Sequence, residues 1–339
     1  MLATTTAQTL TISSAANTQY TAIGLDVGNG AVKLFSALGE SITESYVLCL
    51  NERATHNNSG YVEYLEGSRS DLSNKQWIGG LNAYYQSPSG IHRVNDNPQG
   101  KAELCLQLLL SSLSAQPHRS EWFLNICASV HDGKIFGKSV KQALEGVHKL
   151  RINGKLSTVN IRVERVLEEG SGVAVALKNT FDFTSALLFD LGNGTAIVSA
   201  FNGLQLTDRD YVHDAGVESL IEAIATSEIV RQHLLKPADR HLIRAGIEKG
   251  DFSYGTRCDG WSFKEAYSAA LPGWFEGGLK PLLKKAESRI NSATAVIAVG
   301  GGTQLPGVKN LLSKRSIAVP ENARFLNSKG LYMVALRGC

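Results

Sequence analysis

The sequence has little net charge and no long basic stretch. Its 339 residues hold 34 Lys and Arg against 31 Asp and Glu, a formal net charge of +3. The basic residues are scattered, and small clusters such as Lys284-Lys285 and Lys314-Arg315 are typical of solvated helix faces. Nucleic-acid binders usually concentrate positive charge on one face or along one helix. We therefore expect no direct binding of nucleic acid.

Long apolar runs are also missing. No run approaches the ~18 residues that a transmembrane helix needs. The opening segment, MLATTTAQTLTISSAANTQY, has neither the basic start nor the apolar centre of a signal peptide. We expect a flexible arm over residues 1–19, no membrane association and a cytoplasmic location.

Cysteine and histidine show none of the spacings that bind metals or build disulfide frameworks. The five cysteines are odd in number and widely spaced, without a CxxC pair, and the eight histidines form no HExxH. Hydrophobic residues make up 43% and charged residues 19%, which is typical of a globular protein. The length suits two domains.

One short pattern occurs twice. Residues 26–30 read DVGNG and residues 190–194 read DLGNG, and each follows an apolar run typical of a buried strand. A single Asn-Gly turn is weak evidence, because such hairpins are common. Two copies in separate halves predict two subdomains built on one plan.

A third glycine-rich turn lies near the end of the chain. In ATAVIAVGGGTQLPGVKNLL, a β-branched strand ends in Gly300, Gly301 and Gly302, and a helix is expected to start near Pro306. Glycines at such a turn let backbone amides come close to a bound ligand.

Together the three turns suit a polyphosphate. Two opposed Gly-Asn-Gly turns can offer amide donors from both sides, and Lys33 adds a positive charge. Asp26 and Asp190 would end their strands beside the phosphates, where carboxylates hold hydrated Mg²⁺. Each element alone also fits an ordinary turn or a solvated strand lysine. The chain contains no GxxxxGK[ST], and no GxGxxG opens a helix, which argues against P-loop and dinucleotide-binding folds.

The remaining pattern alternates strands and helices. We expect helices over 101–115 and from 138, a strand over 121–130 and a hairpin turning at NGK (153–155). Residues 50–98 suggest loops and short strands. Residues 261–290 suggest two helices separated by a break near Pro272-Gly273.

The segments LDVGNGAVK, LLFDLGNGTAIV and VIAVGGGTQLPGV resemble the two phosphate loops and the adenosine turn of the actin, sugar kinase and DnaK-type chaperone superfamily. This resemblance implies an α/β, actin-like fold: two related domains, each with a five-stranded sheet, and a nucleotide cleft between them. It implies domain I over 20–176, with an outer subdomain at about 40–100 and the C-terminal helix 325–339 packing back on it. Domain II would cover 177–324.

Within that superfamily, the segment from NICASVHDGK to LEEGSGVAVAL and the ending PENARFLNSKGLY are most similar to bacterial and plasmid actin-like proteins of the ParM/StbA and Alp type. The likeness implies a filament-forming ATPase in plasmid (DNA) segregation. ATP–Mg²⁺ binding would drive polymerisation and hydrolysis would destabilise the filament. Its partners would be further copies of itself and a DNA-binding adaptor protein. The sequence does not choose between ATP and GTP.

The same resemblance assigns roles to individual residues. Glu169 would position the attacking water, with Glu168 as the alternative, and Asp190 would order metal-bound waters. Asp26 and Asp190 are the metal candidates. The implied nucleotide-binding residues are Asp26, Gly28, Asn29, Gly30, Lys33, Gly192, Asn193, Gly194, Thr195, Gly300, Gly301, Gly302, Thr303 and Gln304.

The chain departs from the family pattern at three places. Glu168 stands where a proline usually precedes the water-positioning residue, Ala128-Ser129-Val130 replaces a Gly-Leu-Pro turn, and Ile197 replaces an aspartate. None of these changes removes a phosphate ligand. A small-molecule kinase or a non-enzymatic nucleotide-binding adaptor of the same fold remains the alternative.

Overall fold

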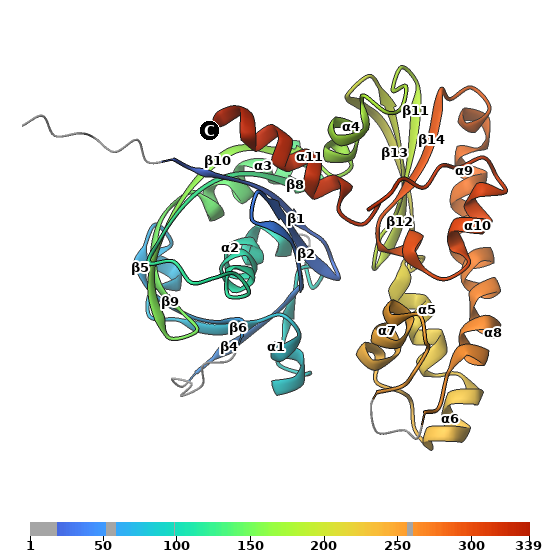
Figure 1. Ribbon diagram of the computed structural model, residues 1–339, viewed down its shortest axis with the longest axis horizontal. Helices are drawn as coiled ribbons and strands as arrows, with labels where there is room; N and C mark the ends of the chain where they lie inside the picture. Colours follow the sequence, from blue (N-terminus) through green and yellow to red (C-terminus); the bar gives the residue numbers. More distant parts are fainter. Residues whose placement is uncertain (1–18, 52–58, 98, 256–259) are drawn as a thin grey trace, which may run out of the picture.

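The protein forms two bodies that lie side by side (Figure 1). The structure, a computed structural model, describes residues 19–51, 59–97, 99–255 and 260–339. Nearly all of the expected N-terminal arm, and Cys258, therefore lie outside the described residues. Within them, no helix has the length and apolarity to cross a membrane.

The first body is a ten-stranded sheet that curls around one central helix, α2 (Gly100–Leu113) (Figure 1). The strand order is β3-β2-β1-β8-β10-β9-β5-β6-β4-β7. The bounds are β1 (Thr21–Val27), β2 (Ala31–Ser36), β3 (Gly39–Glu44), β4 (Tyr46–Leu50), β5 (Tyr61–Gly67), β6 (Gln76–Gly79), β7 (His92–Arg93), β8 (Glu121–Val130), β9 (Gly146–Ile152) and β10 (Lys155–Glu168).

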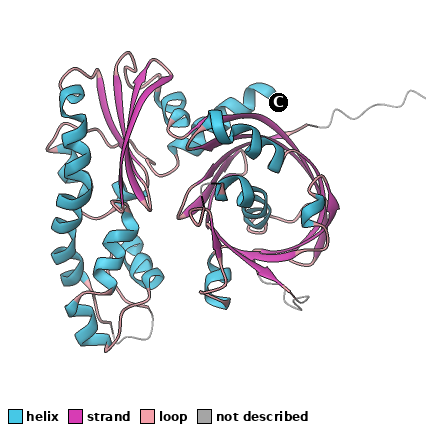
Figure 2. Ribbon diagram, turned by 180° about the vertical axis from the view of Figure 1, so that it is seen from behind, coloured by secondary structure: helices cyan, strands magenta, loops and turns pink. Residues whose placement is uncertain are grey.

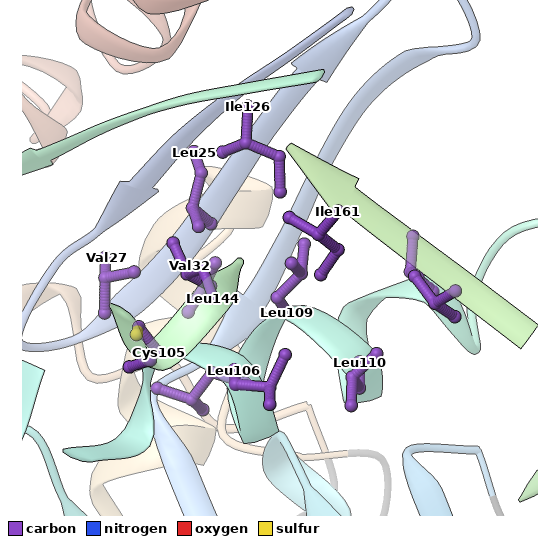
Figure 3. Close-up of a cluster of buried hydrophobic side chains, with 14 of the residues drawn as sticks. Leu25, Val27, Val32, Cys105, Leu106, Leu109, Leu110, Ile126, Leu144 and Ile161 are labelled. Carbon is purple, nitrogen blue, oxygen red and sulfur yellow. The ribbon is translucent and has the colours of Figure 1, made fainter. Parts of the chain in front are cut away.

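Burial of apolar side chains between this sheet and α2 forms the largest core of the body. Leu106, Leu109 and Leu110 of α2 are fully buried and face strand residues such as Leu25 and Ile126 (Figure 3). Each such side chain contributes roughly 1.5–3 kcal/mol by leaving water. Other helices of this body are η1 (Ser70–Leu72), α1 (Leu81–Gln86) and α3 (Gly133–Leu144).

The second body has a four-stranded sheet with helices packed beside it and below it (Figure 2). The strand order is β13-β12-β11-β14, from β11 (Ala186–Leu191), β12 (Thr195–Asn202), β13 (Gln205–His213) and β14 (Ala295–Val299). Its helices are α5 (Val217–Ala225), α6 (Glu228–Leu234), α7 (Arg240–Lys249), α8 (Lys264–Trp274), η2 (Phe275–Leu279), α9 (Lys280–Ile290), η3 (Gly301–Gln304) and α10 (Val308–Ser313).

The expected break near Pro272-Gly273 is wrong. Pro272 lies inside α8, which passes through the π-helical turn η2 directly into α9. A proline removes one backbone donor, and the wider π turn just after it lets the chain continue as a helix.

The expectation of five strands in each sheet is also wrong. In the first body β9 pairs with β10 on one side and with β5 on the other, so the outer strands extend the inner sheet. In the second body an isolated parallel bridge between Ile297 and Ala318 stands where a fifth strand would pair.

The last helix, α11 (Leu326–Ala335), returns to the first body and is followed by η4 (Leu336–Gly338). It packs against β1, β8 and α4 (Ser171–Leu177). Glycines make this packing close, because a β-carbon on Gly24 would overlap the carbonyl oxygen of Ser328. A β-carbon on Gly330 would likewise overlap the carbonyl oxygen of Gly172.

Candidate functional site

A cavity of about 580 Å³ is lined by residues of both bodies, and this volume is usual for a small-molecule site. Most of the residues that the sequence indicates line it: Asp26, Gly28, Asn29, Gly30, Lys33, Glu169, Asp190, Gly192, Asn193, Gly194, Thr195, Gly300, Gly301 and Gln304. Two others lie behind the wall. Thr303 is buried and donates its hydroxyl hydrogen to the Gly300 carbonyl at 2.8 Å. A β-carbon on Gly302 would meet Leu191.

The first Gly-Asn-Gly turn joins β1 to β2. The strand register places Asp26 directly opposite Lys33, and Lys33 Nζ donates to Asp26 Oδ2 at 3.1 Å. The Ser129 hydroxyl donates to the other carboxylate oxygen at 3.2 Å. Burial alone would raise the pKa of Asp26, but Lys33 and Lys101 outweigh it and lower that pKa below its ordinary value. The turn therefore presents an ionised carboxylate with a cation beside it.

The second turn joins β11 to β12 and contacts the start of α5. The Gly192 and Asn193 carbonyls accept hydrogen bonds from the amides of Val217 and Glu218 at 3.0 and 2.8 Å. The Asn193 side chain is held by Arg244 of α7, whose Nη2 donates to Asn193 Oδ1 at 2.7 Å.

The carboxylate of Asp190, at the end of β11, has no hydrogen bond or ion pair among the described residues. Burial, together with repulsion from Asp26 and Glu169, raises its pKa to about 6, although Lys33 and Lys101 act in the opposite direction. A half-buried carboxylate without a partner suits a cation that arrives with a ligand.

These two carboxylates limit how a metal could bind. No group of three or more His, Cys, Asp or Glu side chains is arranged for a metal within the described part of the chain. Mg²⁺ needs only one or two protein carboxylates when phosphates and waters complete its shell. Asp26 and Asp190 fit that use, and would not suffice for a closed protein cage.

Glu169 faces the cavity and Glu168 does not. Glu169 follows β10, lines the cavity and forms an ion pair with Lys101 of α2. Glu168 is not part of the lining, and its Cγ would lie 3.2 Å from a β-carbon on Gly133. Of the two alternatives, only Glu169 lines the cavity.

Arg209 of β13 connects the two bodies next to Glu169. Its guanidinium donates to the carbonyl oxygens of His131, at 2.7 Å, and of Glu169. A change in the relative position of the bodies would therefore disturb the backbone of Glu169.

An aromatic cluster contributed by both bodies lies at the edge of the cavity. The Tyr46 hydroxyl and His241 Nε2 are 3.2 Å apart, and the Tyr84 ring centroid is 4.3 Å from that of His241. Tyr46 and His241 also line the cavity. Burial, with the nearby Arg244, lowers the pKa of His241. The neutral imidazole of His241 suits its contact with the Tyr46 hydroxyl.

The sequence assigns no role to several lining residues, among them Lys101, Arg244, Arg324 and Asn327, although the last two lie in the ending PENARFLNSKGLY. For Lys101, the one local signal in the sequence is its place at the start of the apolar helix KAELCLQLLL. Asn327 donates to the Ser129 hydroxyl at 3.0 Å, and its buried Oδ1 has no partner among the described residues.

No protein-family model and no curated protein matches the chain. The chain does match solved structures. An archaeal actin homolog, Ta0583, superposes with a TM-score of 0.70 at 19% identity, over 93% of this chain and 99% of that one. Bacillus thuringiensis ParM with ATP superposes at 0.72 and 17% identity, over 94% and 99%. The apo form of the same ParM gives 0.61 at 16% identity, over 94% and 97%.

The fold, its two-sided cavity and these superpositions define the class: the chain has the actin-like fold. Within that class its architecture is related to the ParM structures.

Proposed function

We propose that this protein is an actin-like ATPase that binds ATP–Mg²⁺ in the cavity between its bodies and assembles into filaments. The observation that carries the proposal is the opposition of the two Gly-Asn-Gly turns, with Asp26, Lys33 and Asp190 beside them. The moving units are residues 20–176 with α11, and residues 177–324.

The residues divide the chemistry between them. Amides of the two turns and the Thr195 hydroxyl donate to the β- and γ-phosphates, and Lys33 neutralises part of their charge. Asp26 and Asp190 would hold Mg²⁺, which would supply positive charge beside the phosphates. Gly300, Gly301 and Gln304 provide the surface for the nucleoside, with Gly302 and Thr303 supporting it from behind.

Glu169 positions the water that attacks the γ-phosphorus. A bond forms between the water oxygen and phosphorus while the bond to the bridging oxygen breaks, giving ADP and phosphate. Glu169 accepts a proton from the water or orients it by hydrogen bonding. The backbone contact with Arg209 ties this geometry to the closed arrangement of the bodies.

ATP binding shifts the population toward the closed arrangement, and hydrolysis removes that bias. One finding supports this view: contacts join the two bodies, between Tyr46 and His241 and between Arg209 and the His131 carbonyl. We propose plasmid segregation as the role, with further copies of the chain and a DNA-binding adaptor protein as partners.

Assembly is the direct test. Purified protein is incubated with Mg²⁺ and ATP, GTP, ADP or a slowly hydrolysed ATP analogue, then sedimented and imaged by negative-stain electron microscopy. We expect filaments with ATP or its analogue and none with ADP. If neither pelleting nor filaments occur across salt and nucleotide conditions, the filament proposal is wrong. ADP release that depends on an added small molecule would indicate a kinase.

A further inference from the structure

Lys101 is a buried lysine in the cavity wall that no phosphate motif includes. It is the second residue of α2, and only 9% of its surface is exposed. Its ammonium group forms an ion pair with the carboxylate of Glu169, and both side chains line the cavity. A buried lysine needs such a partner, because an unpaired charge in this place is costly.

Each of the four lysine and arginine side chains that line the cavity has a carboxylate partner. Lys33 pairs with Asp26 at 3.1 Å, Arg244 with Glu218 at 2.9 Å and Arg324 with Glu248 at 3.1 Å. The fourth pair, Lys101–Glu169, differs in one respect. Its carboxylate is the group that the proposed function requires for the attacking water, and the ion pair already occupies that carboxylate.

The charge of Lys101 acts on the phosphate region as well as on Glu169. It lowers the pKa of both Asp26 and Asp190, so its ammonium group lies within electrostatic range of both carboxylates. Lysine is a compact charge on a flexible four-carbon stem with three donors, so it can exchange one oxygen partner for another nearby. The dianionic end of a triphosphate attracts it more strongly than a single carboxylate does.

We propose that Lys101 recognises the terminal phosphate of a nucleoside triphosphate and controls when Glu169 becomes available. Without a triphosphate, Lys101 holds Glu169 in the ion pair. When a triphosphate binds, the ammonium group moves to the terminal phosphate, and Glu169 is released to accept a hydrogen bond from water. This inference rests on the proposed function, and it names the γ-phosphate as the group that starts the reaction.

A purely structural role for Lys101 makes different predictions. If the lysine only anchors Glu169, its removal changes the affinities for triphosphate and diphosphate by similar factors. If it binds the terminal phosphate, Lys101→Met lowers the affinity for a slowly hydrolysed ATP analogue about tenfold or more. The same substitution changes the affinity for ADP less than about threefold. Lys101→Arg keeps a charge and restores part of the discrimination.

Glu169→Gln provides the opposite test. It removes the carboxylate that competes for the ammonium group, so triphosphate affinity rises by about threefold or more while hydrolysis slows. If Lys101 only anchors Glu169, we expect no such gain in triphosphate affinity.

The experiment is isothermal titration of the full chain with Mg²⁺ and either the ATP analogue or ADP. The control is Lys141→Met, which removes a lysine from the exposed Lys141–Glu145 pair on the same body. If Lys101→Met fails to fold, Lys101→Met with Glu169→Gln removes both charges, and the same loss of triphosphate preference is expected.

An unchanged ratio of the affinities for the ATP analogue and ADP overturns the inference while the wild type still binds and hydrolyses ATP. A wild type that binds no nucleotide overturns the proposed function itself.

Discussion

Gly30 and Asn193 belong to different bodies, and a β-carbon on Gly30 would stand 2.5 Å from Cγ of Asn193. The asparagine has little room to turn away, because its Oδ1 accepts from Arg244 at 2.7 Å and its Nδ2 donates to Glu218 at 3.5 Å. The contact therefore sets how closely the two Gly-Asn-Gly turns can approach each other.

Gly30→Ala should hold the two turns apart. We expect ATP affinity to fall about tenfold or more, because amide donors at both turns can no longer reach one phosphate chain together. Titration calorimetry measures the affinity. The control is Gly273→Ala, since nothing lies within 4 Å of that added carbon and the residue is helical. The control should leave affinity unchanged and stabilise the fold by up to about 1 kcal/mol. Wild-type affinity in Gly30→Ala would contradict the two-sided clamp.

Glu169→Ala should slow phosphate release by about 10²–10⁴-fold and leave assembly intact, because it removes the group that positions water but no phosphate donor. A phosphate-release assay beside a pelleting assay measures both properties. Glu168→Ala is the matched control, and its hydrolysis should stay near that of the wild type. Lost assembly with unchanged hydrolysis in Glu169→Ala would contradict the assigned role.

Asp190→Asn should stabilise the protein when no nucleotide is present. The change removes a half-buried carboxylate that lacks a hydrogen-bond or ion-pair partner among the described residues, and we expect the melting temperature to rise by about 2–4 °C. The extra stabilisation that ATP–Mg²⁺ gives the wild type should be largely lost. Thermal unfolding with and without ATP–Mg²⁺ measures both effects. A variant that is less stable alone, yet keeps the full response to ATP–Mg²⁺, would show that Asp190 has a structural role.

His148 should make stability depend on pH. It is fully buried, its Nδ1 lies 2.9 Å from the Tyr64 hydroxyl, and its Nε2 lies 3.1 Å from the Leu144 carbonyl. Burial lowers the pKa of His148 below its ordinary 6.5. The unfolded chain therefore binds a proton that the folded chain does not, and stability falls as pH drops below about 6.5, by at most about 1.4 kcal/mol per pH unit.

The check is denaturant unfolding between pH 7 and pH 5. His148→Gln can keep both hydrogen bonds without titrating, so its unfolding free energy should fall less over this range. His118→Gln changes an exposed histidine and should behave as the wild type does. Equal slopes for the wild type and His148→Gln would rule out His148 as the source.

Much of this architecture can be predicted from local sequence. The two DxGNG turns, the strand over 121–130 and the NGK hairpin depend on neighbouring residues, and they occur where expected. Lys101 and Arg244 escape such prediction, because they reach the cavity only through the packing of helices far apart in the chain. The same reason hides the pairing of β9 with β5, which joins the outer strands to the inner sheet and depends on tertiary contacts.

The close fit of α11 against β1 has a consequence for synthesis. β1 leaves the ribosome among the first described residues and α11 among the last, so the groove above Gly24 stays open while the second body is made. Domains usually fold as they emerge, and contacts between distant segments form late. We therefore expect the second body to fold before the first is complete, so that a nascent chain acquires its finished cavity only after α11 has been made.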